Sequence, residues 1–120
     1  SIGFDWDDDL PQDPGNPVYV EKDTTRSGLK IGAVRVMVPD LGTTAGTYLF
    51  DLLKEGVSVL VAPVDLELLV AGTWTTAAVK SDGTENLADG DTMRAIATSD
   101  NIDLAGFTGG VSFTVGMVAQ

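Results

Sequence analysis

The chain has 120 residues, 43% of them hydrophobic, and its 18 acidic and 7 basic residues give a net charge of −11. This length is enough for one domain with a real core, and the acidic charge argues against binding to a nucleic-acid backbone, which needs clustered Lys and Arg. The sequence has neither Cys nor His, which excludes disulfides, thiolate metal sites and a Ser-His-Asp triad, so we expect no cofactor.

The beginning of the chain is acidic and rich in turn-forming residues, and we expect it to form an extended N-terminal arm. Prolines spaced three apart block a helix there and favour an extended path. Phe4 and Trp6 share a parity, so in an extended segment both side chains face the same surface, either of this domain or of a neighbouring molecule. The predicted organisation is therefore an arm (1–28) followed by a β domain (29–120).

The rest of the chain alternates β-prone segments with clusters of Gly, Asp and Pro. Residues 63–70 fit either a strand or one turn of helix, because Pro63 suits a first helical position while apolar residues alternate with Asp65 and Glu67. Roughly seven or eight short strands at this spacing are typical of an all-β fold, a β-sandwich or jelly-roll-like domain. The predicted strands cover residues 29–38, 47–53, 57–62, 73–79, 92–98, 102–104 and 111–118.

The two longest predicted strands differ in their apolar pattern. The last strand alternates strictly, which is typical of a strand with one buried face; its apolar positions are Val111, Phe113, Val115 and Met117. The first strand is apolar on both parities, with Gly32, Val34, Val36 and Val38 on one side and Ile31, Ala33 and Met37 on the other. Such a pattern indicates a central strand or a strand at a subunit interface.

The loop predicted over residues 81–91 is acidic. Hard cations such as Ca²⁺ bind several carboxylate and carbonyl oxygens on a glycine-containing loop, but Asp-Gly pairs also occur simply as hairpin turns in solvent. We predict no metal site. The weak candidate ligands for one are Asp82, Glu85, Asp89 and Asp91.

Carboxylates within the apolar segments are the remaining catalytic candidates. A pair of them can cleave a glycosidic bond without His, but nothing in the sequence brings two together, and we predict that the protein is not an enzyme. These residues are Asp51, Asp65, Glu67 and Asp103.

From residue 28 onward, the order of segments resembles that of small phage virion proteins of the head decoration, or cement, type. A glycine-led strand comes first, a Thr/Gly/Ala stretch leads into an aromatic strand, and two Asp- and Ala-containing strands precede the last one. The segments that carry the resemblance are residues 28–38, 43–51, 63–73, 88–97, 103–106 and 111–118.

The resemblance implies a jelly-roll-like domain that is assembled in the host cytoplasm and decorates the capsid surface of the virion, often as a homotrimer. Its partners would be the major capsid protein or another virion protein, which it would bridge, and neither nucleic acid nor a membrane. The arm would make the partner contacts, with its Asp cluster facing Lys or Arg. The residues expected to do so are Ile2, Phe4, Trp6, Asp7, Asp8, Asp9, Val18, Tyr19 and Val20.

The alternative function is a glycan- or receptor-binding β-sandwich module, such as the tip of a fibre or tail. Under this interpretation Trp74 and Tyr48 offer aromatic rings for sugar stacking, and the loop 81–91 contributes polar contacts. Aromatic residues of this kind are more often core or interface residues than sugar-stacking platforms. No apolar run approaches the roughly 18 residues that a membrane helix needs, and the acidic N-terminus does not resemble a signal peptide.

Overall fold

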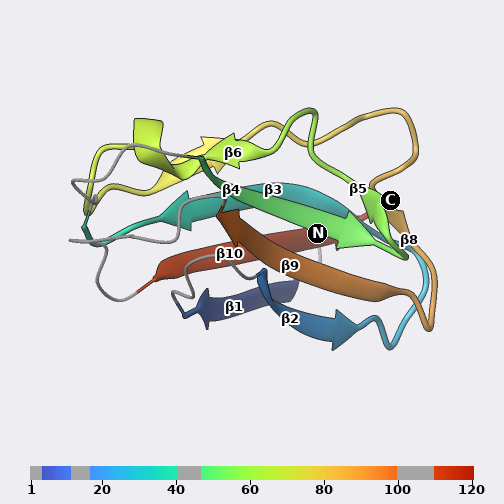
Figure 1. Ribbon diagram of the computed structural model, residues 1–120. Coiled ribbons are helices and arrows are strands. Elements are labelled where there is room, and N and C mark those ends of the chain that lie inside the picture. Colours follow the sequence, from blue (N-terminus) through green and yellow to red (C-terminus); the bar gives the residue numbers. More distant parts are fainter. Residues whose placement is uncertain (1–3, 12–16, 41–46, 100–109) are drawn as a thin grey trace.

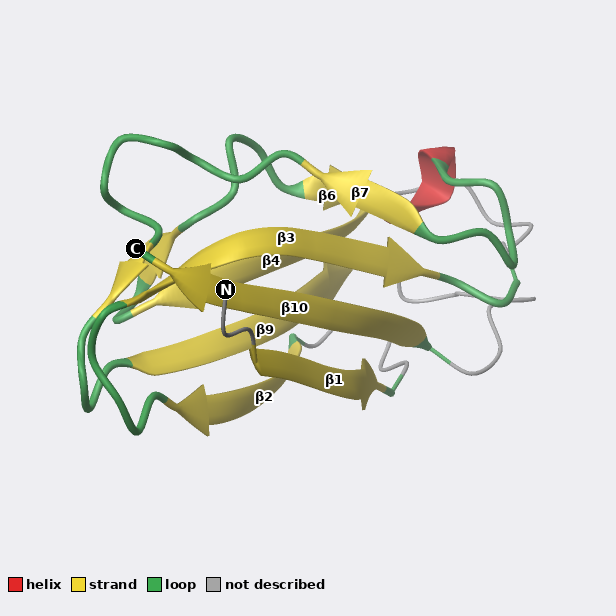
Figure 2. Cartoon of the chain, turned by 180° about the vertical axis from the view of Figure 1, so that it is seen from behind, coloured by secondary structure: helices red, strands yellow, loops and turns green. Residues whose placement is uncertain are grey.

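The computed structural model describes residues 4–11, 17–40, 47–99 and 110–120, which form two antiparallel sheets of five strands each. The sheets pack face to face as two layers, as the opposite views in Figure 1 and Figure 2 show. No helix in this described part of the chain is long and apolar enough to cross a membrane.

Sheet A has the strand order β1-β10-β3-β7, and β8 also pairs with β3. Its strands are β1 (Phe4–Leu10), β10 (Val111–Ala119), β3 (Leu29–Met37), β7 (Thr75–Ala77) and β8 (Asn86–Leu87). Sheet B has the order β2-β9-β4-β5, and β6 also pairs with β4. Its strands are β2 (Val18–Asp23), β9 (Thr92–Ser99), β4 (Tyr48–Lys54), β5 (Val57–Ser58) and β6 (Val64–Asp65), and a 3-10 turn, η1 (Leu66–Leu68), follows β6.

The strand pairing is that of a jelly roll. The first strands of the chain pair with the last, β1 with β10 and β2 with β9, and the inner strands pair as β3 with β7 and β4 with β5. When a long hairpin paired in this way is rolled up, its successive strands go alternately to one sheet and to the other. The prediction of an all-β, jelly-roll-like sandwich is confirmed.

The described part of the N-terminal segment forms one strand of each sheet, which corrects the expectation of a separate arm over 1–28. β1 pairs with β10 from Phe4↔Met117 to Leu10↔Val111, and β2 pairs with β9 along its whole length. The surface that this segment covers is therefore its own domain. The prolines that suggested an arm lie in sequence between the two strands, where they do not interrupt either ladder.

A β-bulge corrects the interpretation of β3 as a strand with two apolar faces. Its partner on β10 shifts register between Gly116 and Met117, so that Gly116 faces Ala33 while Met117 faces Ile31. Gly32 is the extra residue, and the parity of buried positions changes there. The residues of this segment that are buried are Leu29 and Ile31 before the bulge and Val34, Val36 and Val38 after it.

The core lies between the sheets, with aromatic rings at its centre. The Trp6 and Phe113 rings of sheet A meet edge to face, with centroids 5.0 Å apart and an interplanar angle of 86°. Phe113 also contacts Phe50 of sheet B at 5.5 Å. All three side chains are buried, so the N-terminal strand β1 contributes directly to the packing between the two layers.

The shorter elements differ in detail from the predicted ones. Residues 63–70 contain both alternatives in succession, because β6 is followed at once by η1. The strand expected over 57–62 is limited to β5 and an isolated bridge between Leu60 and Val79. The predicted loop 81–91 contains β8, and the piece expected at 102–104 lies outside the described residues.

Candidate functional site

The outer face of sheet A carries a row of polar side chains that crosses four strands. Asp7 of β1 faces Thr114 of β10, Thr114 faces Arg35 of β3, and Arg35 faces Thr76 of β7. Each of the four follows or precedes a buried core residue in its strand, so these side chains point to solvent; the buried neighbours are Trp6, Phe113, Val34 and Ala77. The row brings a carboxylate, two hydroxyls and a guanidinium onto one flat surface.

Two further rows of residues flank this one. Each row has a further carboxylate on β1 and a residue with a small or absent side chain on β10. These rows are Asp5–Gly116–Ala33 and Asp9–Ser112–Met37.

Two adjoining hollows of about 530 and 240 Å³ lie over these rows. Both are lined by Asp5 and Thr114, and the smaller hollow reaches Arg35 and Gly116. We call the combined depression the sheet-A groove. Its larger part is lined by Asp5, Asp7, Asp8, Asp9, Trp74, Ser112, Phe113 and Thr114.

Trp74 is the aromatic side of the sheet-A groove. It stands immediately before β7, and its side chain is 48% exposed although indole is a large apolar group. Across the groove lie the exposed carboxylates of β1. The groove therefore has an apolar ring on one side, acidic groups on the other, and hydroxyls between them.

The floor of the groove is formed by residues with little or no side chain. A Cβ added at Gly116 would lie 3.6 Å from a carboxylate oxygen of Asp5 and 3.8 Å from the carbonyl oxygen of Ala33. These are ordinary van der Waals distances, so packing does not require glycine at this position. Its absence of a side chain nevertheless leaves open space above the sheet, next to Arg35.

Some of the residues expected to contact a partner are buried in the structure, and others are exposed. Trp6 is 7% exposed and packs on Phe113, which corrects its assignment as a partner contact. Val18 and Val20 are partly buried against the core, whereas Tyr19 is 52% exposed on the opposite side of β2. Asp7, Asp8 and Asp9 are exposed like Tyr19, while Ile2 lies outside the described residues and Phe4 begins β1.

The two aromatic residues proposed for sugar stacking also differ in exposure. Tyr48 is 2% exposed, and burial raises the pKa of its phenol, so it cannot serve as a surface platform. Trp74 remains available. The loop 81–91 is not beside it, because β8 within this loop pairs with the beginning of β3 whereas β7, which follows Trp74, pairs nearer its end.

The carboxylates of the loop 81–91 stabilise turns. Asp82 Oδ1 accepts the backbone N–H of Thr84, and hydrogen bonds from Thr84 lower the pKa of Asp82. Glu85 is buried and accepts the N–H of Gly83, and Asp91 accepts the N–H of Ala88. Within the described residues, no group of three or more acidic side chains is arranged to hold a metal ion.

Two of the carboxylates considered for catalysis likewise have local structural partners. Asp51 accepts the Ser58 hydroxyl at 2.7 Å, and Asp65 caps η1 by accepting the N–H of Glu67 at 3.1 Å. Asp103 lies outside the described residues. The sequence pointed to none of Arg35, Thr76 or Thr114, because only strand register brings these residues together.

No protein-family model matches the sequence, and no curated protein is similar to it. Among solved structures, a family 35 carbohydrate-binding module from Clostridium thermocellum is similar, with a TM-score of 0.40 and 16% identity over 98% of this chain and 92% of that chain. A similarity at this level carries no information about ligands or residue roles. The jelly roll is established by the strand pairing of this chain itself.

Proposed function

We propose that this protein is a non-catalytic carbohydrate-binding module whose sheet-A groove holds a sugar. The observation that carries the proposal is the half-exposed indole of Trp74, which lines a groove otherwise formed mainly by carboxylates and hydroxyls. The apolar face of a pyranose ring can lie against an aromatic ring while its hydroxyls hydrogen-bond to polar groups around it.

Each part of the groove would have a distinct role in this binding. Trp74 provides the stacking surface, Asp7 accepts hydrogen bonds from sugar hydroxyls, and Arg35 donates to ring or hydroxyl oxygens. Gly116 adds no side chain to the smaller hollow, which would receive the part of the ligand beyond the stacked ring. Because the described carboxylates of the groove all come from β1, they flank a ligand from one side only, whereas glycoside cleavage needs carboxyl groups on both sides of the bond.

A binding experiment on the intact chain tests the proposal. A glycan array identifies responding sugars, and calorimetry with the best of them compares the wild type with Trp74→Ala. We expect at least tenfold weaker binding in the variant, because the stacking surface is lost. The matched control is Tyr19→Ala, which removes an aromatic side chain of similar exposure, 52%, from the opposite sheet.

The comparison of the two variants shows whether the sheet-A groove binds the sugar. Binding that is lost in Trp74→Ala and kept in Tyr19→Ala, with both variants folded by circular dichroism, supports the proposal. Equal effects of the two substitutions, or a glycan array without any response, would show that the sheet-A groove is not a sugar site.

The second candidate is the virion role implied by the sequence resemblance, in which a homotrimer decorates a phage capsid and bridges its major capsid protein. Several exposed apolar side chains favour self-association of this kind, since such side chains are common at protein interfaces. They are Val57, Val61, Leu68 and Val70, with exposed fractions of 53%, 65%, 80% and 69%. Because Trp6 is buried, this role would not use it for attachment.

The mass of the protein in solution tests the second candidate. Light scattering after size-exclusion chromatography should give a trimer, and Leu68→Ser combined with Val70→Ser should shift it towards the monomer. A monomer at all concentrations in the wild type would contradict self-association through these side chains.

A further inference from the structure

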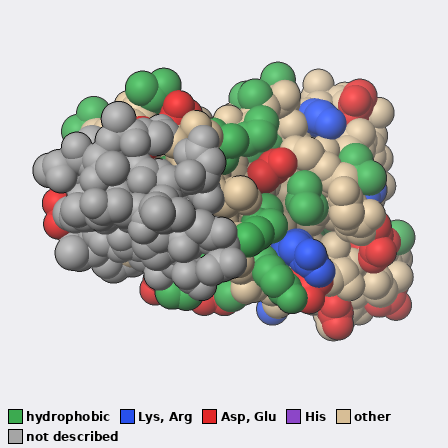
Figure 3. Space-filling view, in the orientation of Figure 1, with side chains coloured by type: hydrophobic (Ala, Val, Ile, Leu, Met, Phe, Trp, Pro, Cys, Tyr) green, Lys and Arg blue, Asp and Glu red, His purple; other side chains and the backbone are tan. Residues whose placement is uncertain are grey.

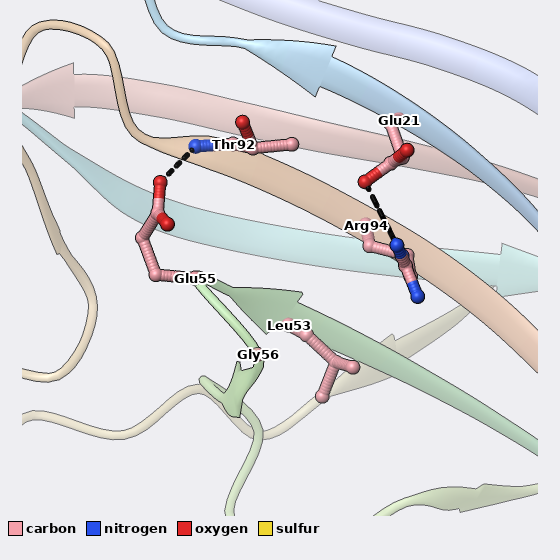
Figure 4. Close-up of a pocket in the computed structure, with 6 residues that line it drawn as sticks. All are labelled: Glu21, Leu53, Glu55, Gly56, Thr92 and Arg94. Carbon is pink, nitrogen blue, oxygen red and sulfur yellow. Dashed lines mark hydrogen bonds and ion pairs between the residues drawn. The ribbon is translucent and has the colours of Figure 1, made fainter.

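A second surface cavity lies on the outer face of sheet B, on the side of the molecule opposite the sheet-A groove. It has a volume of about 370 Å³ and crosses β2, β9 and the end of β4. Figure 3 looks onto this face, where hydrophobic side chains lie beside acidic and basic ones. The residues that line the cavity, drawn in Figure 4, are Glu21, Leu53, Glu55, Gly56, Thr92 and Arg94.

Arg94 is held in place on one side of this cavity. Its Nη2 lies 3.1 Å from a carboxylate oxygen of Glu21, and its guanidinium carbon lies 4.3 Å from the centre of the Tyr19 ring. The ion pair and the stacking contact together fix the guanidinium along β2 and β9. Arg94 therefore neutralises Glu21 but does not reach across to the opposite side.

Glu55 brings a second carboxylate to the cavity, from the turn between β4 and β5. Its Oε1 accepts the backbone N–H of Thr92 at 2.7 Å, as Figure 4 shows. The side chain is therefore fixed towards the beginning of β9, on the other side of that strand from Glu21. The cavity has two carboxylates and one guanidinium, with the apolar side chain of Leu53 on its floor.

The backbone of Glu55 is strained, which is unusual for this residue type. Its φ is +49°, the one positive value among the described residues other than glycine, and Gly56 follows with φ +80°. These angles are those of a type I′ hairpin turn, in which Asn-Gly or Asp-Gly is preferred. A glutamate in this position places its carboxylate at the cavity, although its backbone is strained there. Such strain is concentrated at functional sites.

From this geometry we propose that the sheet-B cavity receives a lysine side chain of a protein partner. The aliphatic stem of the lysine lies on Leu53, and its ammonium group contacts the Glu55 carboxylate, with Glu21 and Arg94 on the far side. Charge complementarity favours a basic partner, because the whole chain carries a net charge of −11. The Tyr and Arg side chains beside the cavity are of the types that dominate binding energy at protein interfaces.

The test is a titration of the ¹⁵N-labelled chain, followed by the backbone amide signals, at constant ionic strength. The probe is the peptide acetyl-Gly-Lys-Gly-amide, and the control peptide carries norleucine in place of lysine, which keeps most of the stem and removes the charge. We expect saturable shifts confined to the neighbourhood of Gly56, Thr92 and Arg94 with the lysine peptide only.

Two variants separate a site from diffuse attraction to an acidic surface. Glu55→Gln keeps an oxygen that can accept the Thr92 N–H but removes the charge, and it should weaken binding about two- to fivefold, the range for an exposed ion pair. Asp7→Asn removes the same charge from the opposite sheet and should leave binding unchanged.

Equal weakening in both variants, or shifts scattered over the acidic surface, would overturn the proposal. Equal binding of the norleucine peptide would also contradict it, since the carboxylates would then play no part. If n-butylamine bound as well as the lysine peptide, the cavity would be a site for small amines and not for a protein. None of these outcomes bears on sugar binding in the sheet-A groove.

Discussion

Replacing Trp6 by alanine decides whether the N-terminal segment belongs to the core or to a partner. Trp6 is 7% exposed and packs edge to face on Phe113, with ring centroids 5.0 Å apart. Truncating a buried Trp to Ala generally costs about 3–5 kcal/mol, part of which, about 0.5–1.5 kcal/mol, comes from the aromatic contact. Since a domain of this kind has a total stability of about 5–15 kcal/mol, the loss should be large.

The assay is urea denaturation followed by far-ultraviolet circular dichroism, which does not depend on the tryptophan that is removed. Tyr19→Ala is the control, because Tyr19 belongs to the same predicted partner surface but is 52% exposed. Its ring contributes a contact with Arg94 that is worth about 0.5–1 kcal/mol at an exposed site. The two substitutions should therefore differ by at least about 2 kcal/mol.

A small and equal effect of the two substitutions would refute this reasoning, because Trp6 would then lie on the surface as a partner contact. If Trp6→Ala does not fold, Trp6→Phe still discriminates. Phenylalanine retains an aromatic contact with Phe113, so this variant should fold with an intermediate stability. A Trp6→Phe variant as stable as the wild type would count against a core role.

Three other predictions follow from individual positions. Gly110→Ala should lower the free energy of unfolding, measured by urea denaturation, by more than about 3 kcal/mol, because φ is +66° there and a Cβ would collide with the Leu10 carbonyl oxygen. An unchanged stability would contradict this close approach of the two backbone segments. Gly116→Ala should leave stability equal or raise it by up to about 1 kcal/mol, since its Cβ makes only ordinary contacts, while calorimetry should show weaker sugar binding in the sheet-A groove. Burial raises the pKa of Tyr48, so the unfolded chain releases that proton at a lower pH than the folded chain, and stability falls as pH rises above about 10. Tyr48→Phe should lose less stability than the wild type over the same alkaline range. Equal losses in the two proteins would show that Tyr48 is not the cause.

The sequence predicted the fold class because its period-2 alternation is strongest in the long strands. β10 alternates without interruption, and its four predicted core residues are all buried. In β3 the same pattern was obscured by one residue, since Gly32 enters a bulge and moves the later side chains to the opposite parity. The isolated Gly32 is a local signal of a bulge, but it does not show where the partner strand shifts register.

The strand β1 was missed for a different reason. Four of the seven residues of β1 are Asp, which is disfavoured in strands, and the prolines that follow it favour an extended arm. What the composition concealed is an alternation in which Trp6 and Leu10 face the core while Asp5, Asp7 and Asp9 face solvent. Tertiary packing on β10 overrides the low strand propensity of the Asp residues.

The candidate site could be predicted only in part. Trp74 was named as a possible stacking residue from its type alone, but its partners come from β1, β10 and β3, which are distant in sequence. Arg35 and Thr114 become neighbours through strand register, and register is set by the whole sheet. For this reason the acidic loop 81–91 attracted attention, although its carboxylates stabilise turns at some distance from Trp74.

The acidic row of β1 has two possible physical roles, which a single triple variant separates. β1 ends the described strand order of sheet A, and an edge strand offers unpaired backbone groups to which another chain can add; charged side chains prevent this. Asp5, Asp7 and Asp9 could therefore protect the edge, bind a ligand, or do both.

Replacing Asp5, Asp7 and Asp9 together by threonine removes the charges and raises strand propensity. If the row protects the edge, light scattering should show association that increases with protein concentration, whereas the wild type keeps a constant mass over the same range. If the row binds the sugar, calorimetry at low protein concentration should show weaker binding even where the variant has the same mass as the wild type. A variant that neither associates nor binds less tightly would leave the row without either role, and sugar recognition in the sheet-A groove would then rest on Trp74, Arg35 and the hydroxyls of β10.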